Sequence, residues 1–267
     1  MDAEILADSI NTATGDRITT FVLPRFPKIL SQELLTHRIF SRNSGSSRAI
    51  PVHKVIENIL ADPYIPTFTR NVKGMQGLDD LSVKQVADAQ AIWQRAMHEA
   101  IANAQRLIEI GVHKQEGNRV IEPFMRIPII ITATDWSNFF ELRTKNDVQP
   151  DFRDIARKMS VLYQESTPKK LAANEWHLPF INYSPSSDIK DILKICTARC
   201  ARVSYLNHYG IINLESDYSL HDRLLEDKHS SPLEHAAKAL PKSTPCRNFK
   251  GWMQYRVHVE EGVEIKS

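Results

Sequence analysis

The sequence feature that most constrains the fold is a long amphipathic pattern between Ser82 and Gly111. Ser82 and Gln85 have the spacing of a capping box, in which each side chain satisfies a backbone N–H of the first helical turn. Apolar residues then recur every three or four positions, and Gly111 is a typical helix end; they are Val86, Ala89, Trp93, Met97, Ile101, Ala104 and Ile108. The pattern predicts one long helix whose apolar stripe faces a protein core.

The remaining elements are shorter. Two β-branched runs, 18–23 and 127–132, predict buried strands. Apolar spacing predicts helices at 27–35, 51–60, 150–163 and 188–199, one that begins near Asp135 and carries Trp136, Phe139, Phe140 and Leu142 inward, and one around 219–226. Segments 62–81, 113–123 and 168–188 are predicted to be polar or loop-like. Helices with a few strands indicate the α+β class, a small sheet with packed helices.

Composition narrows the function classes. A chain of 267 residues with 42% hydrophobic residues can bury a substantial core, and a net charge of +2 gives no basic field for a nucleic-acid polymer. Three cysteines argue against a disulfide framework, and Cys196 and Cys200 have no second Cys/His pair for a metal. The first residues resemble no secretory signal, and no apolar run is long enough to span a membrane. These features predict a cytosolic protein with no metal and no membrane contact.

Residues 35–48 are the most polar functional candidate. They hold three arginines, one histidine, one asparagine and four serines between two predicted helices. Guanidinium groups bind phosphate in a bidentate manner, and a Ser/Gly-rich backbone can approach an anion closely. The alternative is an ordinary polar surface loop.

The spacing within this stretch carries a resemblance. Residues 36–38 (Thr-His-Arg) are followed after seven residues by 46–48 (Ser-Ser-Arg). This resembles the Arg-His-Arg-x7-Ser-x-Arg signature of the flavin-dependent thymidylate synthases, the thymidylate synthase complementing family. Thr36 stands where that family has an arginine, so one cation expected near the flavin is absent or comes from elsewhere.

Other segments are similar to the same family in a different order. Arg119 stands ahead of Pro123, and Asn138-x4-Arg143 precedes an amphipathic helix, as in its nucleotide-binding half. Residues 201–205 (Ala-Arg-Val-Ser-Tyr) and 229–235 (His-Ser-Ser-Pro-Leu-Glu-His) resemble motifs that usually come first. We therefore expect one catalytic domain over 1–267, circularly permuted, with the usual N-terminal portion at about 196–256.

Trp252 and the residues up to Arg256 resemble the segment that ends this portion, although residues 255–256 can also be an ordinary strand end. Permutation is tolerated where chain termini lie close together at the surface.

The resemblance implies reductive methylation of dUMP to dTMP. 5,10-Methylenetetrahydrofolate supplies the carbon, NADPH reduces FAD, and the reduced flavin supplies the hydride. It also implies an α+β fold with a small antiparallel sheet and long packed helices, and a homotetramer with active sites between subunits. No Gly-x-Gly-x-x-Gly follows a predicted strand, which disfavours a Rossmann site.

The resemblance assigns site residues as follows. The dUMP site comprises Ser46, Ser47, Arg48, Arg119, Leu142 and Arg143, with Arg48 and Arg143 catalytic. The FAD site comprises His37, Arg38, Ile39, Asn138, His229, Ser231 and Glu234. Without the resemblance, each arginine is a surface or salt-bridge residue unless the three converge, and His229 and His235 can simply pack around Pro232.

Two alternatives remain. One is a classical thymidylate synthase that uses Cys246, which follows Pro245 as the nucleophile of such enzymes commonly follows proline. The other is a nucleotide- or RNA-binding module without catalysis, which the near-neutral charge disfavours.

Mutation distinguishes the first alternative, a classical enzyme that uses Cys246, from the flavin-dependent family. We expect Cys246→Ala to retain most activity, because the flavin-dependent family uses no cysteine nucleophile. Arg48→Ala and Arg143→Ala should each lose nucleotide binding in a dUMP binding assay. A folded but inactive Cys246→Ala variant would favour the classical enzyme.

Overall fold

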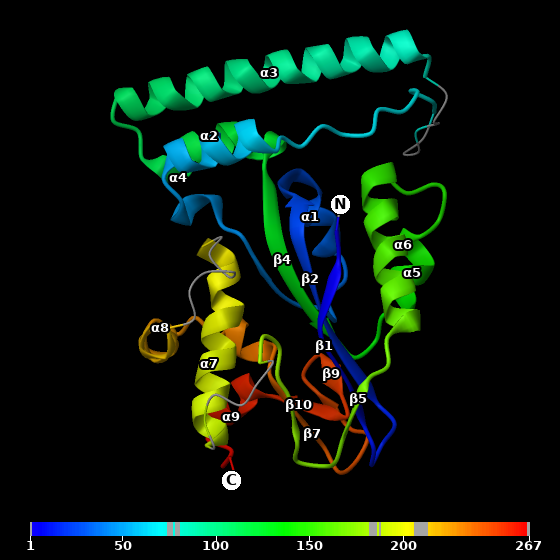
Figure 1. The fold of residues 1–267 in the computed structure, drawn as a ribbon, viewed down its shortest axis with the longest axis vertical. Helices are drawn as coiled ribbons and strands as arrows, with labels where there is room; N and C mark the ends of the chain where they lie inside the picture. The colour runs from blue at the N-terminus through cyan, green and yellow to red at the C-terminus, as the bar shows by residue number, and fades with distance from the viewer. Residues whose placement is uncertain are drawn as a thin grey trace.

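A computed structural model describes residues 2–73, 77, 81–181, 186, 188–205 and 213–265 (Figure 1). Its helices are α1 (Ser31–Leu34), α2 (Val52–Ala61), α3 (Val83–Glu109), α4 (Lys114–Ile121), α5 (Ser137–Arg143), α6 (Pro150–Glu165), α7 (Ile189–Arg202), α8 (Leu214–Glu226) and α9 (Tyr255–Glu261). Its strands are β1 (Glu4–Asn11), β2 (Arg17–Pro27), β3 (Ser41–Ser44), β4 (Arg126–Ala133), β5 (Lys169–Leu171), β6 (Trp176–His177), β7 (Ala237–Ala239), β8 (Pro245–Cys246), β9 (Phe249–Lys250) and β10 (Trp252–Gln254). Short 3-10 turns include η2 (Ser47–Ala49), η3 (Glu122–Phe124), η4 (Val203–Tyr205) and η5 (Ser231–Glu234). The α+β class expected from the sequence is confirmed.

The main sheet of the described residues has the order β3-β4-β2-β1-β5. Every pairing in it is antiparallel except that of β1 with β5. Strand β4 is buried on both faces: Ile129 and Ile131 enter the core under α2, α3, α5 and α6, whereas Ile130 enters the core under α7. Because successive side chains of a strand point to opposite faces, β4 packs into two layers at once. This is why its sequence is a continuous β-branched run.

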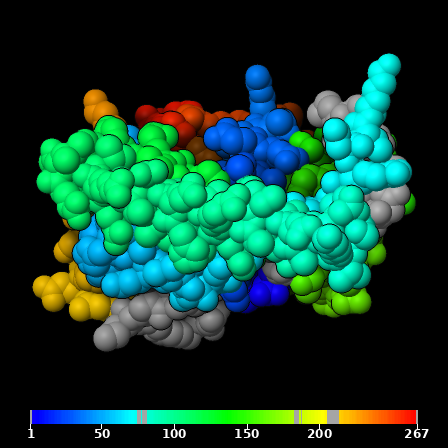
Figure 2. Space-filling model, turned by 90° about the horizontal axis from the view of Figure 1, so that it is seen from above, coloured from blue at the N-terminus to red at the C-terminus, as the bar shows by residue number. Residues whose placement is uncertain are grey.

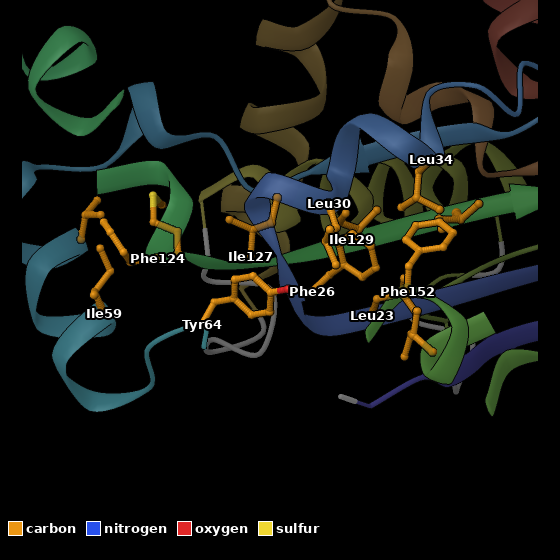
Figure 3. Close-up of a cluster of buried hydrophobic side chains, with 14 of the residues drawn as sticks. Leu23, Phe26, Leu30, Leu34, Ile59, Tyr64, Phe124, Ile127, Ile129 and Phe152 are labelled. Atoms are coloured by element: carbon orange, nitrogen blue, oxygen red, sulfur yellow. The ribbon is translucent and has the colours of Figure 1, made fainter. Parts of the chain in front are cut away.

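Figure 3 shows part of the larger core. Leu23 and Phe26 of β2 and Ile129 of β4 pack with Phe152 of α6, and the rings of Phe26 and Phe152 meet edge to face at 5.9 Å. Leu34 of α1 lies in the same cluster, so the strands and the segment before residues 35–48 share one core. The predicted strands at 18–23 and 127–132 and the predicted helix at 27–35 are confirmed.

The long predicted helix is α3, and its capping box at Ser82 is present. Met97, Ile101 and Ala104 are buried, as expected. The stripe was expected to continue to Ile108, and this was wrong: Ile108 is 39% exposed. Ile108 lies near the C-terminal end of α3, and Figure 2 shows that this helix lies across the outside of the molecule.

Three expectations about local structure need correction. Residues 113–123 were expected to be a polar run, but 114–121 form α4, where Gly117 lies close to Ile108 of α3. A Cβ at 117 would lie 3.1 Å from the Ile108 Cδ1, so the glycine that weakens the helix signal also lets α4 approach α3. Residues 41–44 were expected in a loop and form edge strand β3. The helix expected at 219–226 begins earlier, at Leu214.

The other predicted helices, at 51–60, near 135, 150–163 and 188–199, are confirmed as α2, α5, α6 and α7. Parts of the predicted loops at 62–81 and 168–188 lie outside the described residues.

The C-terminal residues form a second layer on the main sheet. Strands β10, β7 and β6 make a small antiparallel sheet beside α7, α9 and the hairpin β8–β9 (Figure 1). Gly251 turns the chain between β9 and β10 with a positive φ of 72°, and its carbonyl accepts a hydrogen bond from the Asn11 side chain. This turn therefore holds the C-terminal layer against the β1–β2 hairpin.

We expect Gly251→Ala to lower the free energy of unfolding by about 2–4 kcal/mol, because alanine is strained at positive φ and its Cβ would overlap the Asp16 carboxylate. Gly15→Ala is the matched control, since Gly15 has φ 77° and nothing within 4 Å of a Cβ. Its expected cost is about 1 kcal/mol. Equal losses for both variants in denaturant unfolding would show that the Asp16 contact does not matter.

Candidate functional site

His37 is the centre of one group of predicted site residues. It follows α1, is 7% exposed, and stacks on Phe40 with ring centroids 5.4 Å apart. Its Nε2 accepts a hydrogen bond from Nε of Arg143 at 3.0 Å. Burial lowers the pKa of His37 to about 4, and Arg143 and Arg42 add to the effect. His37 is therefore a neutral acceptor at physiological pH.

Arg143 is held by the same segment. Its Nη2 donates to the Thr36 hydroxyl at 2.9 Å and to the Glu33 carbonyl at 3.3 Å, and its Nη1 lies 3.3 Å from the Glu33 carboxylate. Its guanidinium also lies 5.1 Å from the centre of the Phe152 ring. Thr36, the departure from the family signature, thus receives a hydrogen bond from a predicted catalytic arginine.

Arg42 and Arg256 are cations close to Glu234. Arg42 donates to the Leu34 carbonyl at 2.6 Å and to the His37 carbonyl at 3.4 Å, which satisfies the end of α1. Burial lowers the pKa of Arg42, and the nearby Glu234 carboxylate opposes that shift. Arg256 pairs with Glu234 at 2.7 Å. The Glu234 segment therefore lies beside the residues that follow His37.

Further contacts join the same two parts of the chain. Asn43 is within hydrogen-bond distance of the Ser231 hydroxyl, at 3.2 Å, and of His235 Nε2, at 3.0 Å. Asn248 donates to the Ile39 carbonyl at 3.0 Å. Residues 39–43 are thus clamped by segments about 200 residues later in the chain.

A second group of predicted residues gathers around turn η2 and α4. The Asn118 side chain, which is fully buried, donates to the carbonyls of Ser47 and Ile50 at 2.6 and 2.9 Å, on either side of Arg48. Ser47 donates to the Glu122 carboxylate. Arg48 and Arg119 are exposed on these two packed elements. The turn is rigidly held while its arginine faces outward.

The two groups lie toward opposite ends of β4. Ser41 pairs with Thr132 near the end of the strand, whereas the Gly45 amide donates to the Pro128 carbonyl near its start. Arg143 follows the end of β4 through α5, and Arg48 comes after Gly45. Among the described residues, no hydrogen bond or ion pair joins Arg48 or Arg119 to Arg143. The three arginines were expected to converge. Within a single chain, Arg48 and Arg119 instead lie on one pair of packed elements, and Arg143 belongs to the other group.

The remaining predicted residues lie at the surface. Arg38, Ile39, Asn138, Leu142 and His229 are exposed, and Ser231 and Glu234 are half-buried. Leu142 was expected to face inward and is 43% exposed. The inward face of α5 runs through Trp136 and Arg143, and Leu142 lies to one side of it. Arg119 and Arg48 are also exposed.

Sequence reasoning missed several residues that hold these groups together. They are Arg42, Asn43, Asn118, Glu122 and His235 as a buried partner. Arg42 and Asn43 lie inside the seven-residue spacer of the signature, where only the pairing of β3 with β4 shows their roles. Cys246 gains no support as a nucleophile, since burial and the Glu261 carboxylate raise the pKa of its thiol.

The structure resembles a solved enzyme in fold. It superposes on a UMP/dUMP methylase, PolB from Streptomyces cacaoi, solved with 5-Br UMP, with a TM-score of 0.50 and 17% identity; the match covers 61% of this chain and 88% of that one. A flavin-dependent thymidylate synthase from Thermococcus onnurineus is 24% identical over 145 residues. Those residues are 53% of this chain and 52% of the relative, so the match spans about half the length of each protein.

The structural likeness to PolB shows that the chain shares an α+β fold with that protein. The model of the thymidylate synthase complementing protein family matches residues 17–169, more than half of the chain. The chain belongs to this family. In the part of the chain that the structure describes, no helix is both long and apolar enough to cross a membrane.

The depressed pKa of His37 predicts a pH effect on stability. Below about pH 6.5 the unfolded state takes up a proton on His37 that the folded state does not bind until about pH 4, so stability falls as pH falls. We expect His37→Gln, whose amide oxygen can still accept from Arg143, to reduce this loss by about 1 kcal/mol per pH unit between about pH 6 and 4.5.

Denaturant unfolding across that range measures the effect. His53→Gln is the control, because His53 is exposed on α2. An unchanged slope in His37→Gln would contradict a neutral buried His37.

Proposed function

We propose that the protein is a flavin-dependent thymidylate synthase that methylates dUMP to dTMP. The observation that carries the proposal is the family match over residues 17–169, which includes the signature at 36–48, Arg119 and Arg143. The Thermococcus relative, named a flavin-dependent thymidylate synthase, supports the same activity. Methylenetetrahydrofolate and NADPH are the proposed co-substrates, and the cytoplasm is the proposed location.

The proposed dUMP site is shared between two protomers. Ser46, Ser47, Arg48 and Arg119 of one protomer bind the nucleotide, and Leu142 and Arg143 of a neighbour complete the site. The separation of these groups along β4 supports this arrangement. A homotetramer with active sites between subunits satisfies it, since closed symmetry repeats one interface at every site.

Each arginine has a distinct chemical role in this proposal. The exposed Arg48 and Arg119 can bind phosphate oxygens in a bidentate manner. Arg143 is fixed by His37, Thr36 and Glu33, so its positive charge is pre-oriented. Such a charge stabilises the negative charge that develops on the pyrimidine ring without reorganisation during the reaction.

The side chains around the His37 group provide hydrogen-bonding and charged groups of the kinds that bind a flavin. His37, Arg38, Ile39 and Asn138 lie on one side, and Ser231, Glu234 and His229 belong to the segment clamped against residues 39–43. The exposed cations suit a pyrophosphate and the exposed Ile39 suits a ring face. When bound, FAD supplies the hydride that reduces the transferred carbon to a methyl group.

The permuted order is part of the proposal. We propose one catalytic domain over 1–267 in which about 196–256 is the family's usual N-terminal portion. The contacts of Ser231 with Asn43, and of Glu234 with Arg256 beside Arg42, support this assignment.

Purified protein should carry flavin absorption and oxidise NADPH only when dUMP is present. A colourless protein that binds no FAD would contradict the proposed function. Binding of RNA in its place would favour the non-catalytic alternative.

The shared site predicts complementation between inactive variants. Arg48→Ala and Arg143→Ala homotetramers should each be inactive, because every site lacks one arginine. Tetramers reassembled from an equal mixture should recover about a quarter of wild-type activity, since that share of sites takes both arginines from the intact groups.

The matched control is a mixture of Arg48→Ala with Arg119→Ala. Both residues belong to one group on one protomer, so no site in this mixture is complete and activity should stay absent. Recovery in the control, or none in the first mixture, would contradict the proposed division of the site.

A further inference from the structure

Six buried side chains form an unbroken chain of hydrogen bonds across the main sheet, which we call the polar chain. Its members are Ser9, His177, Thr20, Thr132, His235 and Asn43, and none is more than 7% exposed. The successive distances are 2.9, 2.8, 2.7, 2.8 and 3.0 Å. The polar chain ends beside Ser231, a proposed flavin contact. No sequence pattern connects Ser231 with β1, where the polar chain begins.

The direction of the polar chain is decided at Asn43. In one orientation of its amide, the nitrogen faces three acceptors that share its two hydrogens: the Ser231 carbonyl at 3.2 Å, the Arg42 carbonyl at 3.1 Å and His235 Nε2 at 3.0 Å. Its oxygen then accepts from the Ser231 hydroxyl at 3.2 Å. The opposite orientation places the amide oxygen against both carbonyl oxygens, so the hydrogen-bond network selects the first.

This orientation determines the proton positions along the rest of the chain. His235 accepts at Nε2, so as a neutral ring it carries its proton on Nδ1 and donates to Thr132. Thr132 then donates to Thr20, and Thr20 donates to His177 Nε2. His177 in turn carries its proton on Nδ1 and donates to Ser9. Both histidines have the same tautomer.

Neutral histidines are required for this arrangement, because a doubly protonated ring would present two donors to the chain. Burial lowers the pKa of both His177 and His235 to about 3. Both rings are therefore neutral throughout the physiological range.

We infer that the polar chain fixes the Ser231 hydroxyl as a hydrogen-bond acceptor toward its ligand. Its proton is committed to the Asn43 oxygen, so only its lone pairs face outward. This step rests on the proposed function: Ser231 accepts a hydrogen bond from an N–H or O–H group of the flavin and does not donate one to a phosphate oxygen. Asn43, His235 and Thr132 are positioning residues for this contact.

Reversal of the polar chain would change this preference. If the Asn43 nitrogen faced the Ser231 oxygen, at the same 3.2 Å, the hydroxyl proton would be free to donate to an anion. The tautomer of His235 reports which state is present, because Nε2 accepts in one state and donates in the other.

The test is a 15N–1H correlation spectrum of full-length protein labelled at histidine, with His177→Gln and His235→Gln used for assignment. Nδ1–H tautomers for both rings support the inference, and an Nε2–H or protonated ring at neutral pH overturns it. This result does not depend on flavin. If the wild type binds no FAD, the proposed function and the Ser231 contact fall, while the spectrum still decides the direction of the chain.

The role of the chain is tested with Thr132→Val, which removes the acceptor of the His235 Nδ1–H at constant shape. We expect His235 to change to the Nε2–H tautomer and FAD affinity to fall about fivefold. Thr197→Val is the matched control, because the fully buried Thr197 hydroxyl has no hydrogen-bond partner in the described part of the chain. An unchanged His235 tautomer, with FAD affinity equal to that of the control, would overturn the positioning role.

Discussion

The pairing of β4 with β2 and β3 is the constraint on which the rest of the structure depends. Because β4 is buried on both faces, Ile129 and Ile131 commit it to one core while Ile130 and Thr132 commit it to the other layer. A shift of one residue would exchange these faces and bury Thr132 among aromatic rings. The strand is therefore fixed in register, and its contacts with the two groups, at Thr132 and Pro128, are fixed roughly 13 Å apart. Arg48 and Arg143 lie beyond these two points, and in the proposed assembly a second copy brings such groups together.

The Thr36 position shows how a departure from a family signature can be absorbed locally. An arginine there would place a second guanidinium beside Arg143, whereas the threonine hydroxyl gives Arg143 an acceptor at 2.9 Å. Like charges at such a distance repel, and a hydroxyl removes that repulsion while adding a hydrogen bond. Arg42, which the signature treats as spacer, is a half-buried cation next to Glu234. The local charge thus depends on a residue that motif comparison does not examine.

The sequence predicted elements well where a single periodic pattern dominates, as in α3, α6 and β4, because burial of one stripe or of both faces leaves a clear record. It failed where tertiary contact overrides local preference. Gly117 lowers the helix signal of α4 yet lies close to Ile108 of α3, and β3 is a polar edge strand that is held by β4 and by distant segments of the chain. For the candidate site, motif spacing found the residues that face outward, such as Arg48 and Arg119. It could not find the partners of Asn118 or His235, since these partners are far away in the chain and buried polar residues have no periodicity of their own.

The polar chain is costly for a protein interior. Two neutral histidines of the C-terminal layer meet two threonine hydroxyls of β2 and β4 at buried positions where aliphatic side chains would pack without hydrogen-bond requirements. Replacement of a whole buried network by apolar groups is often neutral, whereas removal of one member leaves a donor or acceptor unsatisfied. Such a chain is thus stable only if every member is present, and it gives a defined direction that an apolar core cannot give. Asn43 lies at the end of the chain that contacts the half-buried Ser231, where a fixed orientation matters to the proposed ligand. The polar groups that are costly to bury are therefore the ones that determine which hydrogen-bonding atoms of Ser231 face outward.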